Sequence, residues 1–180
     1  MKQHYFIGIK VPEHIAKAIV NEREKTNVHT THKTLPVAED LHITLFYLGH
    51  VEQIVLTSIV ERLQDIHWEA FELTTSGLSH FGNAQTPRVI YTALEDSNPL
   101  HDLQQKIVQQ LSKVIEINNI KDFNAHITIA KKWAAANELH TTDFQLPKMS
   151  FDVSHFSIFQ INNNRSPRYE DIVCIQNRGV

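Results

Sequence analysis

Hydrophobic and polar positions along the chain follow two periodicities, one typical of strands and one of helices. Residues 5–10 alternate and are rich in aromatic and β-branched side chains, which predicts a strand. The same argument predicts strands over residues 41–48, 71–78, 88–94, 125–130, 151–161 and 169–175. Apolar residues at helical spacing predict helices over residues 13–25, 53–68 and 98–114. Between them we expect a loop or short strand over 28–36, loops over 80–87 and 162–167, and a helical turn over 134–139.

Helices and strands are therefore mixed along the chain. Strands that follow one another directly late in each half favour antiparallel pairing over a doubly wound parallel sheet. No Pro- or Gly-rich linker divides the sequence. We predict one α+β domain over residues 1–180, built of two interleaved lobes rather than two consecutive domains.

Composition narrows the class of partner. The chain is 42% hydrophobic and 21% charged with a net charge of −3, which is ordinary for a soluble protein and gives no overall basic field for long duplex nucleic acid. Any nucleic-acid contact should be local, for example one phosphate or a strand end. The apolar runs are too short for a membrane span or a secretory signal, so we expect a cytoplasmic protein with no membrane association. We also expect a monomer. The single cysteine, Cys174, excludes an internal disulfide and is expected to be buried.

One tetrapeptide pattern occurs twice. Residues 42–45 read His-Ile-Thr-Leu and residues 126–129 read His-Ile-Thr-Ile, with the two histidines 84 positions apart. Side chains alternate between the faces of a strand, so His42 shares a face with Thr44, and His126 shares one with Thr128. A single His-x-Thr is usually structural. The repeat in two apolar strands favours a functional pair, because two buried histidines without a role would carry an uncompensated desolvation cost.

These four side chains suit acid–base cleavage of a phosphodiester. Histidine titrates near neutrality, so one copy can take a proton from water while the other gives one to the leaving oxygen. Threonine hydroxyls can donate hydrogen bonds to phosphate oxygens. We therefore predict His42 and His126 as catalytic residues and Thr44 and Thr128 as phosphate-binding residues. The chemistry demands no metal and no cofactor, and we expect neither.

At these residues the sequence resembles the 2H phosphoesterase superfamily, and within it the RNA 2′,3′-cyclic phosphodiesterases, also described as 2′-5′ RNA ligase-like or LigT-like proteins. The likeness covers nearly the whole chain. Four segments carry it: residues 5–13 resemble the family's first strand, 41–49 its first motif, 87–91 its Pro-Arg-Val strand and 123–131 its second motif.

The resemblance implies a bilobal α+β fold in which two antiparallel sheets face a central cleft and helices lie outside. It implies hydrolysis of RNA ends or nucleotides that carry a 2′,3′-cyclic phosphate to 2′-phosphates, with reversible 2′-5′ joining of RNA ends as a further activity. O3′ is then the leaving group, so one histidine protonates O3′ while the other activates water. We assign His42 as general acid and His126 as general base, and the reverse assignment is also open.

Two positions depart from the family's pattern. Ala125 stands where the family often has proline, and Lys131 stands where it has arginine. Lysine attracts phosphate but lacks arginine's bidentate fork, which bears on affinity for longer RNA and on ligation. We retain Lys131 and Arg88 as predicted substrate-binding residues. Weaker candidates for RNA contact are Lys132, Phe81 and Tyr91, and we interpret the two aromatic residues as core residues.

Three other interpretations stay open. His29 and His32 have a two-residue gap that could chelate zinc, but no cysteine or acidic pattern accompanies them, and a polar loop is the preferred interpretation. A non-catalytic module that binds RNA ends would use the same cleft but would leave the repeated His and Thr residues unexplained. A 2H phosphodiesterase for another small cyclic phosphate or nucleotide would keep the chemistry and change the substrate.

Overall fold

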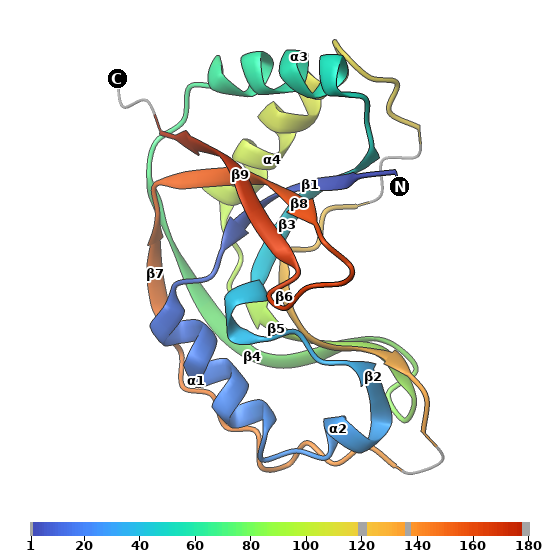
Figure 1. The fold of residues 1–180 in the computed structure, drawn as a ribbon. Helices are drawn as coiled ribbons and strands as arrows, with labels where there is room; N and C mark the ends of the chain where they lie inside the picture. Colours follow the sequence, from blue (N-terminus) through green and yellow to red (C-terminus); the bar gives the residue numbers. More distant parts are fainter. Residues whose placement is uncertain (1, 119–121, 136–137, 178–180) are drawn as a thin grey trace.

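The computed structural model describes residues 2–118, 122–135 and 138–177, which form a large antiparallel sheet with flanking helices (Figure 1). The strands are β1 (His4–Lys10), β2 (His32–Thr34), β3 (His42–His50), β4 (Phe71–Gly82), β5 (Pro87–Leu94), β6 (His126–Trp133), β7 (Ser150–Val153), β8 (His155–Ile161) and β9 (Tyr169–Gln176). The helices are α1 (Glu13–Arg23), α2 (Val28–Thr31), α3 (Gln53–Gln64) and α4 (Asn98–Leu111), with a short 3-10 helix η1 (Ala38–Asp40).

The strand order β7-β4-β5-β6-β3-β1-β8-β9 forms one connected sheet, and β2 pairs with β6 beside this path. Neighbouring strands pair antiparallel throughout, which confirms the α+β class. The two sheets expected from the sequence are two halves of this path. They join where β3 meets β6, at the register pair of Ile43 and Ile127.

Helices α3 and α4 lie together at one end of the molecule, and α1 and α2 lie at the other (Figure 1). Helix α4 shows how the sequence pattern produces this packing. Its buried residues recur every three or four positions and form one stripe: Leu100, Leu103, Ile107 and Leu111. The Ser97 side chain caps its first turn by accepting the N–H of Leu100 at 3.4 Å. No helix of the described ranges is long and apolar enough to span a membrane.

A glycine lets β1 approach β3 closely. Gly8 pairs with Thr44 in the β1–β3 register. A Cβ at this position would stand 2.7 Å from the carbonyl oxygen of Ile43, which is backbone and cannot turn away. Any larger residue would therefore displace β3 at its first motif.

β-bulges decide which side chains of β3 and β6 share a face. In the β1–β3 pairing the register shifts between Ile7 and Gly8, with one extra residue on β3. A bulge reverses the alternation beyond it, so Tyr47 rather than Phe46 returns to the face of the first motif. A similar shift in the β5–β6 pairing returns Lys131 to the face of the second motif.

The structure differs from the expected boundaries in four segments. Residues 151–161 form β7 and β8 instead of one strand, because the chain leaves its partner β4 for β1 at Ser154. Strand β4 continues through Gly82 into the expected loop. Residues 28–36 contain the short strand β2, which was one of the expected alternatives, and also the helix α2, which was not expected. The helical turn expected over 134–139 includes residues 136–137, which lie outside the described residues, and residues 134–135 and 138–139 are not helical.

The expectation that Cys174 is buried is wrong. Cys174 lies exposed on β9, the last strand of the sheet path. An edge strand has a neighbour on one side only, so an apolar run there does not guarantee burial.

Candidate active site

The two His-Ile-Thr motifs lie side by side. Their central isoleucines pair across β3 and β6 and are fully buried. Because the strands are antiparallel, His42 lies across from Thr128 and Thr44 lies across from His126, all on the opposite face. The structure therefore brings together the four residues that the repeated motif predicts.

Both histidines are anchored in the same way. Nδ1 of His42 lies 2.7 Å from the carbonyl oxygen of Asp40, and Nδ1 of His126 lies 2.7 Å from that of Asn124. In each case the carbonyl belongs to the residue two positions earlier. A carbonyl oxygen only accepts hydrogen bonds, so Nδ1 carries the proton and Nε2 of the neutral ring holds a lone pair. Each imidazole thus carries its lone pair on Nε2, the nitrogen that can exchange a proton with substrate.

A cavity of about 200 Å³ opens over β3 and β6 beside His42. The motif residues His42, Thr44 and Thr128 line it, together with Lys131 from farther along β6. Its other wall residues are Phe6, Pro36, Asp40, Tyr47, Ile161 and Tyr169. Four of the six predicted site residues therefore share one cavity.

Two aromatic rings enclose His42. The Phe6 ring centroid lies 4.4 Å from that of His42, and Tyr169 lies edge-on at 4.9 Å. This burial lowers the pKa of His42 from 6.5 to about 4. The hydrogen bond to Asp40 opposes the shift, and the charges of Lys131 and His126 add to it. His42 is therefore neutral at pH 7 in the free protein.

His126 has an aromatic surround of its own. The ring centroids of Phe81 and Tyr91 lie 4.9 and 5.1 Å from that of His126. Burial lowers the pKa of His126 below 6.5, against the opposing hydrogen bond to Asn124. The interpretation of Phe81 and Tyr91 as core residues is incomplete: Tyr91 is only 6% exposed, but both rings pack on His126. The sequence reasoning missed this role because it assigned residues 80–87 to a loop, whereas residues 79–81 pair with residues 89–91 between β4 and β5.

The two motif threonines have different partners. Thr44 Oγ1 lies 3.1 Å from Nε2 of His42, and since that nitrogen holds a lone pair, the hydroxyl donates to it. Thr128 lines the cavity without a side-chain hydrogen bond among the described residues. Thr44 therefore supports His42 in the free protein, and its hydroxyl can turn toward a bound phosphate.

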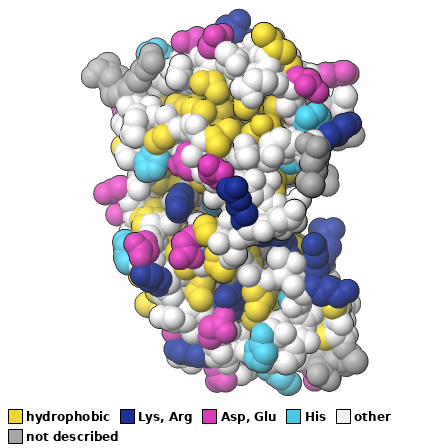
Figure 2. Space-filling view, in the orientation of Figure 1, with side chains coloured by type: hydrophobic (Ala, Val, Ile, Leu, Met, Phe, Trp, Pro, Cys, Tyr) yellow, Lys and Arg dark blue, Asp and Glu magenta, His cyan; other side chains and the backbone are white. Residues whose placement is uncertain are grey.

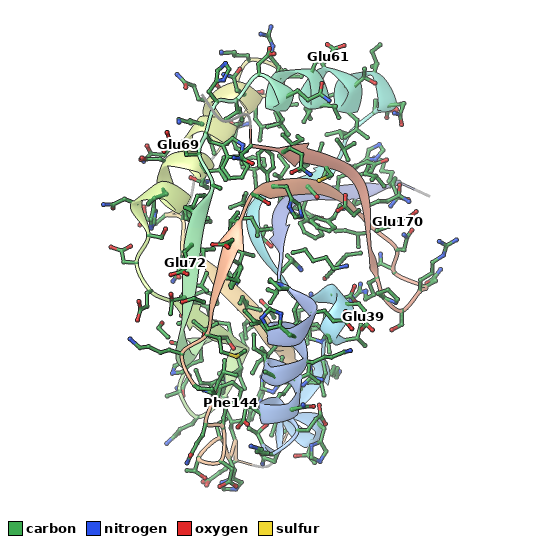
Figure 3. The ribbon with its side chains drawn as sticks, turned by 90° about the vertical axis from the view of Figure 1, so that its left-hand side faces the viewer. Glu39, Glu61, Glu69, Glu72, Phe144 and Glu170 are labelled. Atoms are coloured by element: carbon green, nitrogen blue, oxygen red, sulfur yellow. The ribbon has the colours of Figure 1, made fainter. Side chains whose placement is uncertain are left out.

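Asp40 is a site residue that the sequence reasoning missed. Its buried carboxylate, 4% exposed, accepts the backbone N–H of Arg168 at 2.9 Å and that of Tyr169 at 3.0 Å. Glu39 precedes Asp40 and Glu170 follows Tyr169 in the chain, and Figure 3 shows both glutamates on the same side of the molecule. Asp40 thus fixes the start of β9 beside His42, although 128 positions separate it from Arg168.

Lys131 and Tyr169 are in contact in the wall of the cavity. Lys131 Nζ lies 3.5 Å from the Tyr169 hydroxyl, a long hydrogen bond. Burial and the charge of Arg168 lower the pKa of Lys131, and burial raises the pKa of Tyr169. The sequence reasoning missed Tyr169, because no motif includes it and a polar loop separates it along the chain from the other site residues.

Arg88 and Lys132 do not join the cavity. Val89 pairs with Lys131 on the cavity face, so Arg88 points to the opposite face of β5 and is exposed. Lys132 is exposed with a left-handed φ of 66°. Contact between Arg88 and substrate stays a prediction, and the observed geometry gives it no support.

His32 lies on β2 and is buried, at 6% exposure, so the interpretation as part of a polar loop is wrong for it. Its Nε2 donates to the carbonyl oxygen of Pro87 at 2.9 Å, and its Nδ1 accepts from Thr31 Oγ1 at 2.9 Å. Both ring nitrogens are therefore used, and His32 has none free to share a metal with His29. Across residues 2–118, 122–135 and 138–177, no group of three or more His, Cys, Asp or Glu side chains is placed to hold a metal ion.

Sequence comparison decides the family. The pattern of the 2′-5′ RNA ligase superfamily matches residues 11–165, most of the chain and both motifs. The chain belongs to the 2′-5′ RNA ligase superfamily. Membership confirms the resemblance drawn from the two His-x-Thr motifs, and the match spans both motif histidines of β3 and β6.

Individual curated proteins resemble this chain over most of its length. An RNA 2′,3′-cyclic phosphodiesterase of Bacillus subtilis (strain 168) is 28% identical over 179 residues, which cover 98% of this chain and 97% of the relative. One of Thermotoga maritima is 28% identical over 162 residues, covering 86% and 84%. The structure of E. coli LigT complexed with 3′-AMP superposes with a TM-score of 0.83 at 20% identity, over 99% of this chain and 100% of that one. At this identity the superposition shows a shared fold.

Proposed function

We propose that the protein is a metal-independent phosphodiesterase that hydrolyses RNA 2′,3′-cyclic phosphate ends to 2′-phosphates. The paired anchoring of His42 and His126 carries this proposal, because it leaves two Nε2 atoms for proton exchange on one face of the sheet. The names of the B. subtilis and T. maritima relatives support the substrate. E. coli LigT was solved in complex with 3′-AMP, which supports a nucleotide as a ligand of this fold.

The reaction needs one base and one acid. The base takes a proton from water, and the water oxygen forms a bond to phosphorus as the P–O3′ bond breaks. The acid gives its proton to O3′, and the product carries a 2′-phosphate and a free 3′-hydroxyl. Each histidine ends in the protonation state in which the other began, so proton exchange with solvent resets the pair.

We assign His42 as the base and His126 as the acid, the reverse of the assignment made from the sequence. The low pKa of His42, about 4, supports this choice, because burial and Lys131 hold its ring neutral with a lone pair on Nε2. Lys131 does not act on His126 in the same way. The negative phosphate of a bound substrate raises the pKa of both rings, which favours the charged form that His126 needs for the acid role, while Lys131 opposes the effect at His42.

Polar groups of the cavity hold the phosphate in this scheme. The hydroxyls of Thr44 and Thr128 and the ammonium of Lys131 surround the space beside His42. They would donate hydrogen bonds to the phosphate oxygens, which gain negative charge as water attacks.

The same site can join RNA ends. When the 5′-hydroxyl of a second RNA takes the place of water, its attack expels O3′ and forms a 2′-5′ phosphodiester, and the reverse reaction regenerates the cyclic phosphate. We further propose that the enzyme works as a monomer in the cytoplasm, which light scattering and cell fractionation would test.

Product analysis tests the proposal. The protein is incubated in EDTA with a short RNA that ends in a 2′,3′-cyclic phosphate, and the product is assigned by ³¹P NMR. We expect a 2′-phosphate. A 3′-phosphate would contradict O3′ as the leaving group. No conversion of this RNA or of nucleoside 2′,3′-cyclic phosphates, alongside turnover of another cyclic phosphate such as a 3′,5′-cyclic nucleotide, would overturn the proposed substrate.

A further inference from the structure

A second hollow adjoins the catalytic cavity. Its volume is about 440 Å³, and it shares Tyr47, Lys131, Ile161 and Tyr169 with the cavity beside His42. Its far wall comes from the N-terminal residues 2–4 and from the loop 162–168 between β8 and β9. Ligand sites typically measure about 300–1,000 Å³, so the hollow is large enough for a nucleotide. We call it the loop groove.

The loop groove concentrates positive charge. Lys2, Lys131, Arg165 and Arg168 line it, and none of its described wall residues is Asp or Glu. The chain as a whole has a net charge of −3, and on the face shown in Figure 2 Lys and Arg side chains mix with Asp and Glu. The nearby Glu170 approaches Arg165 only at 3.9 Å between two exposed side chains, a pair that water screens. The groove therefore favours an anion.

An aromatic ring stands where the loop groove meets the cavity. Tyr47 is 57% exposed, which is unusual for a large aromatic side chain on a central strand. Its hydroxyl hydrogen-bonds Nδ1 of His4 at 2.8 Å, so the ring is held at its far end and keeps much of its surface free. Exposed, fixed aromatic rings beside cations are the platforms on which unpaired bases stack.

The loop that closes the groove is held in place. Asp40 accepts the backbone N–H of Arg168, and the Arg168 side chain donates to the Asn163 side chain. Nε of Arg168 is buried without a partner among the described residues, so its guanidinium has donor capacity that the protein does not use. The groove is thus built before a ligand arrives.

We propose that the loop groove binds the nucleotide that precedes the cyclic phosphate end, with its base on Tyr47 and its phosphodiester between Arg165 and Arg168. This inference rests on the proposed function, because it takes the terminal cyclic phosphate to lie beside His42. The next phosphodiester of an RNA strand then leaves the cavity on the 5′ side, where the groove begins. The substrate class is consequently an oligonucleotide end rather than a mononucleotide. Arg165 and Arg168 supply guanidinium groups that can bind a phosphate through two parallel hydrogen bonds, which the ammonium of Lys131 cannot do.

Binding of the product tests the groove without relying on turnover. Dissociation constants are measured by fluorescence anisotropy for a labelled tetranucleotide ending in a 2′-phosphate, with a nucleoside 2′-phosphate as competitor. We expect the tetranucleotide to bind at least ten-fold more tightly, given that one stacked base and one phosphate contact each contribute about ten-fold. Tyr47→Ala and Arg165→Ala should each lose about ten-fold of the tetranucleotide affinity, whereas Tyr47→Phe keeps the ring and should stay near wild type.

Arg62→Ala is the matched control, because Arg62 is an exposed arginine on α3, away from the groove wall. Equal affinity for the tetranucleotide and the mononucleotide would overturn the inference, as would wild-type tetranucleotide binding by both Tyr47→Ala and Arg165→Ala.

Turnover measurements distinguish failure of the groove inference from failure of the proposed function. If cyclic mononucleotides and cyclic-ended RNA are hydrolysed with equal kcat/KM, the groove inference fails while the proposed function stands. If neither is hydrolysed but the tetranucleotide binds through Tyr47 and Arg165, the groove stands and the catalytic proposal fails.

Discussion

Ile43 on β3 lies directly opposite Ile127 on β6, and this register pair joins the two halves of the sheet. Both side chains are fully buried in the core. A slip of one residue would turn every side chain of one motif to the other face, so the buried isoleucines also fix the side on which the histidines stand. Packing in the core thereby determines the geometry of the site.

Substitution of the motif threonines tests their role with phosphate. Thr44→Val and Thr128→Val keep the shape of the side chain and remove the hydroxyl. We expect each to lower kcat by about 10²-fold, the usual cost of losing one donor to a transition-state oxyanion. Steady-state kinetics on an RNA ending in a cyclic phosphate provides the measurement.

The two threonines should differ in a second readout. The Thr44 hydroxyl donates to Nε2 of neutral His42, so its loss should raise the pKa of His42, which ¹H–¹⁵N NMR can follow. Thr128→Val should leave that pKa unchanged. Wild-type kcat in both variants would contradict the phosphate-binding role.

Asp40 is expected to act as a positioning residue. Its backbone carbonyl anchors His42 whatever its side chain, so Asp40→Asn should affect the site through the N–H groups of Arg168 and Tyr169. One carboxylate oxygen becomes an amide donor that faces a backbone N–H. We expect a loss of about 1–3 kcal/mol in the free energy of unfolding and a rise in KM larger than the fall in kcat.

Asp65→Asn is the control for Asp40→Asn, because Asp65 is exposed at the end of α3. Urea unfolding and steady-state kinetics should show it unchanged. A fall in kcat with KM unaltered in Asp40→Asn would assign Asp40 a role in the chemical step and contradict the positioning role.

The pKa of His42 predicts how stability depends on pH. Its folded value of about 4 lies below the ordinary value of 6.5, so the unfolded chain binds a proton that the folded protein does not. The neutral His42 ring therefore contributes about 3 kcal/mol to the free energy of unfolding. This contribution is fully present above pH 6.5 and is lost as the pH falls through 4. Urea unfolding at pH 7 and pH 4.5 should show a smaller loss of stability in His42→Ala than in wild type. His155→Ala, which removes an exposed histidine of β8, should keep the wild-type difference.

The sequence predicts the parts of the fold that local signals specify. Helix α4 has a cap at Ser97 and an unbroken apolar stripe, and the paired motifs identify themselves by repetition. The break at Ser154 has no such signal, because hydrophobic residues run on from β7 into β8 while the chain changes its partner strand.

The remaining site residues depend on structure that alternation alone does not show. Counting by twos from His42 places Phe46 on the cavity face, and only the bulge on β3 puts Tyr47 there instead. Lys131 reaches the cavity by a bulge on β6, and the family resemblance rather than the periodicity identified it. The bond between Asp40 and the backbone at Tyr169 joins residues far apart in the chain, and no local pattern predicts such a contact.

The central claim is that His42 and His126 carry out acid–base catalysis without a metal. The most direct test measures hydrolysis of an RNA ending in a 2′,3′-cyclic phosphate, in EDTA, by wild type, His42→Ala and His126→Ala. We predict full wild-type activity, a loss of about 10²–10⁴-fold in each variant with unchanged circular dichroism, and a wild-type rate for the exposed-histidine control His29→Ala. A wild-type rate in either His42→Ala or His126→Ala, or loss of wild-type activity in EDTA, would contradict the claim.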